Sequence, residues 1–192
     1  MIDVCKKLWL ENWNIGEFNC VDEGKVAYSG TMCPVRMYDP DKPIKHGIKF
    51  YCANDSLTGY CWGLEPYCGS GHRILEDTDW DYDNLNFPER IVLYFMSKCP
   101  QYTSFFTDRY YTTCRGIELG YERNRCYWTG TMMANKKGMP WKFLCDFNQL
   151  DSDRGFYTWS WEKEKNIWAI NWKDRNVVPL ASNRYGCDFE FI

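Results

Sequence analysis

The sequence predicts an α/β fold, in which a mixed five-stranded sheet carries flanking helices and a β-rich segment follows. Three observations favour this class. Hydrophobic residues make up 45% and aromatic residues 18% of the 192 residues, enough for one packed core. Strand-like runs alternate with helical segments up to residue 140. Beyond residue 140 the pattern indicates strands alone.

One helix and three strands are expected in the first part of the chain. Apolar residues near helical spacing predict a helix over residues 2–13, which Asn14-Ile15-Gly16 ends. The strands are expected over residues 18–22, 47–53 and 60–67, with residues 25–29 continuing or turning the first. Asn54-Asp55-Ser56 with Gly59 is typical of a hairpin. Three prolines exclude a central strand over residues 30–43 and favour a basic loop.

The later elements complete the pattern. Pro88 suits the first turn of a helix and Glu89 its positive end, and this helix is expected to run to about residue 98. Thr112 or Thr113 can cap a second helix. Strands are expected over residues 104–108, 125–134, 156–161, 167–172 and 176–181. The order matches a ribonuclease H-like core over residues 1–140, followed by a β-rich insertion-like segment over residues 141–192.

Composition narrows the functional classes. The eleven cysteines are odd in number and none are spaced Cys-x-x-Cys, which favours reduced, mostly buried thiols in an intracellular protein. With only two histidines, a zinc site is not expected. No apolar run is long enough to span a membrane, and the first residues do not form a signal peptide. The net charge is −3, so any contact with DNA requires a local basic patch.

Two aspartates mark candidate catalytic positions. Asp22 ends the first expected strand and Asp108 ends the fourth, and these strands are neighbours in a ribonuclease H-like sheet. The two carboxylates are therefore predicted to meet at one sheet edge, about 4–6 Å apart. Carboxylate oxygens suit Mg²⁺ or Mn²⁺, which can activate an attacking oxygen and stabilise a leaving one in phosphoryl transfer. The alternative is that each is an ordinary turn aspartate.

Four segments, in order and spacing, resemble the piggyBac transposase family. The first contains Asp22 and a basic Pro/Lys hairpin, and the second resembles the family's second-acid motif, with Arg109 in place of the usual Asn. The third is similar to a Gly-Thr-x-Arg-x-Asn segment, with Met133 in place of the usual Arg. The fourth is similar to a strand that leads towards the third acid. The segments are residues 21–71, 103–113, 130–140 and 172–182.

This resemblance implies metal-dependent DNA cleavage and strand transfer. It assigns Asp22 and Asp108 as catalytic residues and as ligands of a weakly bound Mg²⁺ or Mn²⁺ ion. It implies a DNA partner and a nuclear location. Contact with DNA phosphates would come from the basic residues Arg36, Lys42, Lys45 and Lys49. The alternative for these four residues is an ordinary solvated loop.

The departures from the family are equally specific. Residues 183–192 do not match the motif that carries the third catalytic Asp, and nothing around Asp188 supports it as a substitute. We therefore expect a truncated, catalytically inactive core that self-associates through exposed aromatic surface. Three alternatives stay open: an active transposase core, a transposase-derived DNA- or protein-binding module, and an unrelated soluble binding domain. Metal binding and nuclease activity distinguish them.

Overall fold

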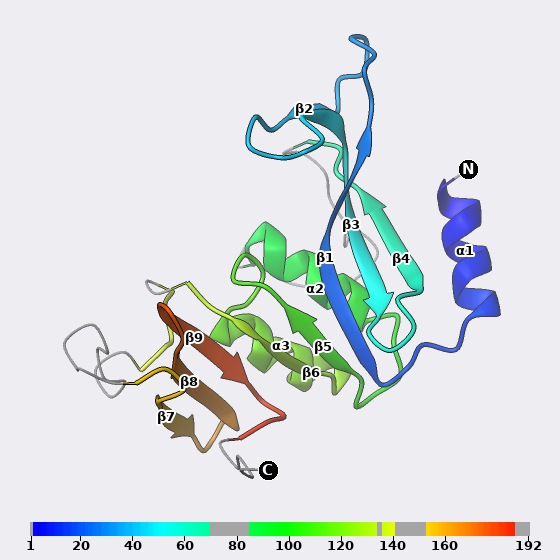
Figure 1. Ribbon diagram of the computed structural model, residues 1–192. Helices are drawn as coiled ribbons and strands as arrows, with labels where there is room; N and C mark the ends of the chain where they lie inside the picture. The colour runs from blue at the N-terminus through cyan, green and yellow to red at the C-terminus, as the bar shows by residue number, and fades with distance from the viewer. Residues whose placement is uncertain (1, 70–84, 134–135, 141–152, 187–192) are drawn as a thin grey trace. The chain divides into compact units, whose positions relative to one another are not determined.

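A computed structural model of the chain describes residues 2–69, 85–133, 136–140 and 153–186 (Figure 1). They fall into two compact units, Met1–Leu85 and Asn86–Ile192. No helix among these residues is both long and apolar enough to cross a membrane. The predicted division of the chain at residue 140 stays a prediction.

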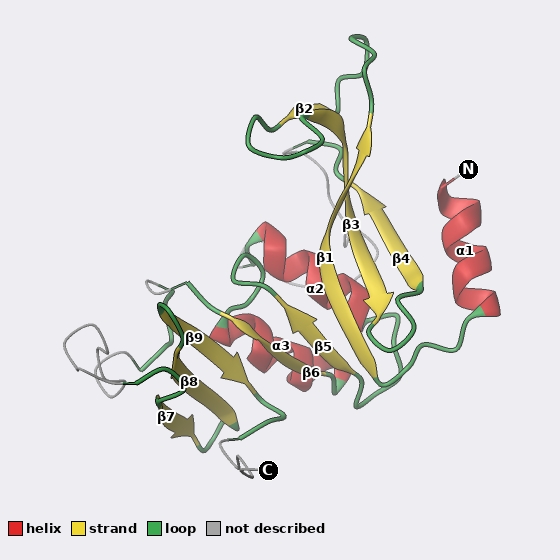
Figure 2. Ribbon diagram, viewed as in Figure 1, coloured by secondary structure: helices red, strands yellow, loops and turns green. Residues whose placement is uncertain are grey.

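The first unit is one helix and an antiparallel sheet (Figure 2). Strand β3 is its centre: β1 pairs with one edge, while β2 and β4 share the other, opposite residues 46–48 and 50–54 respectively. Strand β2 lies inside the predicted basic loop and is an edge strand of the sheet. Prolines are tolerated at edge strands and not at central ones. The elements are α1 (Ile2–Asn12), β1 (Phe18–Ala27), β2 (Arg36–Tyr38), β3 (His46–Asp55) and β4 (Cys61–Pro66).

Strand β3 buries the face opposite to its most apolar one. Tyr51 and Ala53 are buried, whereas Ile48, Phe50 and Cys52 on the other face are only half-buried. The buried face also contains Trp62 of β4, whose indole Nε1 donates a 2.7 Å hydrogen bond to Asn19 in β1. This face is therefore the core side of the first sheet.

The β3–β4 hairpin, predicted from Asn54-Asp55-Ser56 and Gly59, forms around the buried Asp55. Its Oδ1 accepts hydrogen bonds from the backbone of Leu57 at 3.0 Å and Thr58 at 2.9 Å, and from the Thr58 hydroxyl at 3.0 Å. Burial alone would raise the pKa of this carboxyl, but bonds from Thr58, Leu57 and Gly16 bring the pKa below its usual range. The ionised Asp55 thus stabilises the turn.

Acid should unfold the chain partly through Asp55. Because its folded pKa is depressed, its contribution to the free energy of unfolding is complete above the unfolded pKa of about 3.9 and is lost as pH falls through the lower folded value. In Asp55→Asn, urea titrations at a series of pH values should show a shallower loss of stability below pH ~4. Asp41→Asn, on an exposed loop, is the control and should keep the original slope. An unchanged slope in Asp55→Asn would contradict this assignment.

The second unit combines two helices with a mixed sheet of order β5-β6-β9-β8-β7. Strands β5 and β6 are parallel, and β6–β9, β9–β8 and β8–β7 are antiparallel. Helix α3 packs on β6 and β8 and against α2. The α/β class and the mixed sheet with flanking helices are thereby confirmed. The elements are α2 (Phe87–Met96), β5 (Ser104–Thr107), α3 (Cys114–Asn124), β6 (Tyr127–Thr131), β7 (Tyr157–Glu162), β8 (Ile167–Lys173) and β9 (Val177–Ser182).

Both helices begin where the sequence indicates. Pro88 lies in the first turn of α2, and the Glu89 side chain accepts a 2.8 Å hydrogen bond from the backbone N–H of Asn86. Thr113, rather than Thr112, caps α3: its hydroxyl accepts from the Gly116 N–H at 2.9 Å. The two helices are joined directly, because the Thr113 hydroxyl donates to the buried Glu89 carboxylate.

Candidate functional site

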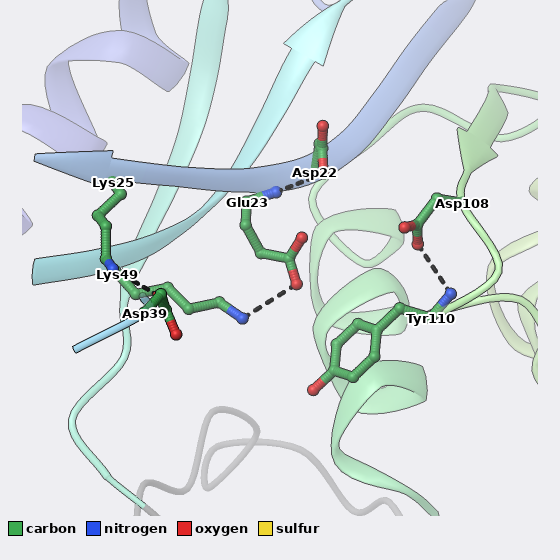
Figure 3. Close-up of polar contacts among 7 residues, drawn as sticks. All are labelled: Asp22, Glu23, Lys25, Asp39, Lys49, Asp108 and Tyr110. Carbon is green, nitrogen blue, oxygen red and sulfur yellow. Dashed lines mark hydrogen bonds and ion pairs between the residues drawn. The ribbon is translucent and has the colours of Figure 1, made fainter. Parts of the chain in front are cut away.

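Asp22 lies within β1 rather than at its end. The strand continues to Ala27, because residues 23–27 pair with residues 47–51 of β3. Val21 faces the core and is buried, so the alternating pleat leaves Asp22 exposed. Its Oδ1 accepts a 2.7 Å hydrogen bond from the Glu23 N–H (Figure 3). This exposed carboxylate is consistent with a ligand for a hard cation.

Asp108 follows β5 directly and is exposed. Its Oδ1 accepts a 2.8 Å hydrogen bond from the Tyr110 N–H, as Figure 3 shows. Its main-chain carbonyl accepts from the Thr112 N–H at 3.2 Å and from the Thr112 hydroxyl at 2.8 Å. The turn that presents Asp108 is therefore held by both backbone and side-chain bonds.

A buried polar network supports this turn. The hydroxyls of Thr107 and Thr112 are 2.7 Å apart, and the Trp128 indole donates to Thr107 at 2.7 Å. Gly130 in β6 packs against the same two threonines: a Cβ there would lie 2.2 Å from the Thr112 hydroxyl and 2.4 Å from the Thr107 carbonyl. Sequence reasoning placed Gly130 in a family-like segment but did not identify this role, since no local pattern marks a long-range contact.

The two acids belong to different units, and their predicted approach stays a prediction. Both positions supply carboxylate oxygens, the donors that Mg²⁺ and Mn²⁺ prefer. Within the part of the chain that the structure describes, no group of three or more His, Cys, Asp or Glu side chains could hold a metal ion. Asp188 lies outside the described residues. Among the described residues, Asp22 and Asp108 are therefore single carboxylates and do not belong to such a group.

The four predicted DNA-contacting residues have different environments. Lys42 and Lys45 are exposed. Lys49 forms a 3.0 Å ion pair with Glu23, visible in Figure 3, and its ammonium lies 4.9 Å from the centre of the Tyr51 ring. Their contact with DNA stays a prediction.

Two further contacts hold the predicted basic loop over residues 30–43 in position. Arg36 donates to the Ser29 carbonyl at 3.3 Å. Lys25 pairs with Asp39, and this hydrogen bond holds the pKa of the Asp39 carboxyl below its usual range. Sequence reasoning did not identify the Lys25–Asp39 pair. It ties β1 to Asp39, which lies inside the predicted basic loop over residues 30–43.

Comparison with known proteins identifies the family. The family described as Transposase IS4 matches residues 1–190. The chain belongs to this transposase family. Among solved structures, the transposase chain is similar to one described as the cryo-EM structure of piggyBac transposase synaptic complex with hairpin DNA. A search of curated proteins gave no match.

The structural likeness defines the fold of this transposase chain. The TM-score is 0.79 at 24% sequence identity, and the match covers 98% of the chain. The chain spans 37% of the length of that piggyBac transposase. The resemblance to piggyBac transposases seen in the sequence is confirmed, since the chain has the fold of that structure and itself belongs to a transposase family.

Proposed function

We propose that this chain is a transposase-derived catalytic segment in which Asp22 and Asp108 are the first two carboxylate ligands of a divalent metal site. The main observation is that both aspartates are exposed, and in each Oδ1 accepts a hydrogen bond from a nearby backbone N–H. Each carboxylate is thus oriented by its own strand or turn. The family match over residues 1–190 supports the assignment to DNA strand cleavage and transfer.

A bound Mg²⁺ or Mn²⁺ ion would supply positive charge to an attacking and a leaving oxygen during phosphoryl transfer. The role of the chain is to hold two carboxylates in position. Two acids retain such an ion weakly, since Mg²⁺ gives up its waters reluctantly. We therefore propose that the 192-residue chain by itself binds metal but does not complete a two-metal centre.

DNA is the proposed partner, and the nucleus the proposed location. The solved piggyBac transposase of similar fold is described with hairpin DNA. In this chain the exposed Lys42 and Lys45 are the residues most available to phosphate, while Arg36 and Lys49 hold the loop and strand beside them. Replacing Lys42 and Lys45 by Ala should weaken binding equally across DNA sequences and reduce its salt dependence.

Metal binding tests the proposal. With free Mn²⁺ tenfold above its Kd, the free energy of unfolding should rise by about 1.4 kcal/mol through mass action. Asp22→Asn and Asp108→Asn should each abolish this gain, measured by thermal melting, while leaving the melting temperature without metal unchanged. Asp153→Asn, an exposed acid elsewhere, is the control and should keep the gain. Equal stabilisation of all three variants would place the ion elsewhere and refute the proposal.

Catalysis is tested separately with the same proteins. We expect no cutting of DNA that carries terminal repeats. Two carboxylates do not complete a two-metal centre, so the negative charge on the attacking and leaving oxygens is not fully stabilised. Nicking that depends on Mn²⁺ and vanishes in Asp22→Asn would overturn the proposed inactivity and indicate a further carboxylate ligand.

A further inference from the structure

A cavity in the second unit gathers charged side chains from several segments. Its volume is about 540 Å³, within the range of small-molecule sites. The described part of its lining comes from α3, β7, β8, the turn between β7 and β8, and residues 137–140. Three cations and two carboxylates belong to this lining and give it one net positive charge: Arg115, Lys137, Lys165, Glu118 and Glu162. The cavity therefore suits an anion better than a cation or an apolar molecule.

One carboxylate holds two of the cations side by side. Glu118 lies one turn after Arg115 in α3, and its Oε2 accepts a 3.2 Å hydrogen bond from the Arg115 guanidinium. Its Oε1 lies 2.9 Å from the Lys165 ammonium, in the turn between β7 and β8. The Glu118 side chain is only 16% exposed, whereas Arg115 and Lys165 keep 56% and 49% of their side chains exposed. The carboxylate thus fixes both cations without covering them.

Both cations keep hydrogen-bond donors for a ligand. A guanidinium has five N–H groups and an ammonium has three, while Glu118 contacts one nitrogen of each cation. Burial alone would raise the pKa of Glu118, but hydrogen bonds from Lys165 and Arg115 bring this pKa below its usual range. The bond to Glu118 also raises the pKa of Lys165, so all three groups are charged at neutral pH. The exposed Lys137 adds a second ammonium to the cavity.

Two buried oxygen atoms lie one step along the sheet from the cavity. Ser160 of β7 and Ala169 of β8 are paired, and both line the cavity. Thr158 and Asn171 are the next pair on that face, because alternate residues of a strand point to the same side. Thr158 Oγ1 and Asn171 Oδ1 are buried, and neither has a hydrogen-bond partner among the described residues. Buried polar atoms are normally satisfied, so these two favour a ligand that brings donors of its own.

We propose that this cavity binds a nucleoside phosphate, whose phosphate group contacts Arg115, Lys137 and Lys165. An arginine fork and two ammonium groups match the negative charge and the acceptor oxygens of a phosphate. The cavity also meets the first turn of α3, where the partial positive charge of the helix favours phosphate. The nucleoside extends towards Thr158 and Asn171, because its hydroxyl and amino groups supply donors to these oxygens. A free nucleotide and the 5′ end of a DNA strand share this chemistry.

Titration calorimetry of the whole chain without divalent metal tests the site independently of the proposed metal centre. AMP should bind at one site per chain, and adenosine about tenfold more weakly, since it lacks the phosphate. A preference for a 5′-phosphorylated over a 5′-hydroxyl DNA strand would identify the ligand as a strand end, whereas AMP binding without this preference would identify a free nucleotide. Equal binding of AMP and adenosine, or no binding of either AMP or the phosphorylated strand, overturns the proposal.

Single variants place the ligand in the cavity. Arg115→Gln and Lys165→Met should each weaken AMP binding about tenfold, because each removes a charge-assisted hydrogen bond. Lys163→Met, on the same turn but outside the described lining, is the matched control and should bind AMP unchanged. Thr158→Val should weaken the binding of AMP but not of inorganic phosphate, and an unchanged AMP affinity there, or an equal loss in Lys163→Met, refutes the assignment. Circular dichroism checks each fold, and the exposed Lys137→Met repeats the test if another variant unfolds.

Discussion

Replacing Glu89 by alanine should lower the free energy of unfolding by about 3 kcal/mol. Glu89 is buried, and its two carboxylate oxygens accept from the Asn86 N–H and the Thr113 hydroxyl. Removing the carboxylate leaves the buried Thr113 hydroxyl without an acceptor, at a cost of roughly 1–3 kcal/mol, and also removes the part-buried hydrogen bond from the Asn86 N–H. The loss is large because the Glu89 carboxylate accepts hydrogen bonds both at the start of α2 and from the residue that caps α3.

Urea denaturation measures this effect. Glu122→Ala, which removes an exposed carboxylate from α3, is the matched control and should change stability by less than about 0.5 kcal/mol. Glu89→Gln should fall between the two, since it keeps the shape of the side chain but offers one acceptor oxygen. A loss in Glu89→Ala no greater than in the control would mean that the contact between the helices contributes nothing to stability.

Gly130→Ala should cost about 1–3 kcal/mol, the usual range for overpacking a buried site. The added methyl would meet the Thr112 hydroxyl at 2.2 Å and the Thr107 carbonyl at 2.4 Å, and the second contact is with backbone. Relief requires β5 or the turn after it to move, so the Asp108 carboxylate should shift as well. The gain in melting temperature from Mn²⁺ should therefore shrink together with stability.

Gly24→Ala is the control for this substitution. It also adds a methyl group to a strand, but the nearest atom is the Cys52 sulfur at 3.2 Å, which a rotation of the thiol relieves. Its stability should change by less than that of Gly130→Ala. A Gly130→Ala protein with unchanged stability and full Mn²⁺ binding would show that the turn accommodates the added methyl group, and would contradict this prediction.

Local signals predicted most of the elements. Pro88 and Glu89 identified the start of α2, and the hairpin residues around Asp55 identified the β3–β4 turn, because each signal acts within a few residues. The sequence left open whether residues 25–29 continue or turn the first strand, and the short β2 was missed, because both segments depend on hydrogen bonds to β3 rather than on their own residues.

The candidate site was predictable only in its exposed residues. Asp22 and Asp108 were visible as acids beside strands, although Asp22 lies within β1 and not at its end. The residues that support the Asp108 turn could not be predicted. Thr107 contacts Trp128 and Gly130, which lie more than twenty positions later in the sequence, and no shared motif marks these contacts. Packing at that range is set by the sheet and not by the neighbouring residues.

The position of β9 has a consequence for synthesis on the ribosome. Strand β6 ends at Thr131. One of its edges pairs with β9, which spans Val177–Ser182 and also pairs with β8. A nascent chain therefore presents one edge of β6 without its partner until β9 has emerged. Unpaired edges recruit strands from other chains, so a product that stops before β9 would be prone to aggregate.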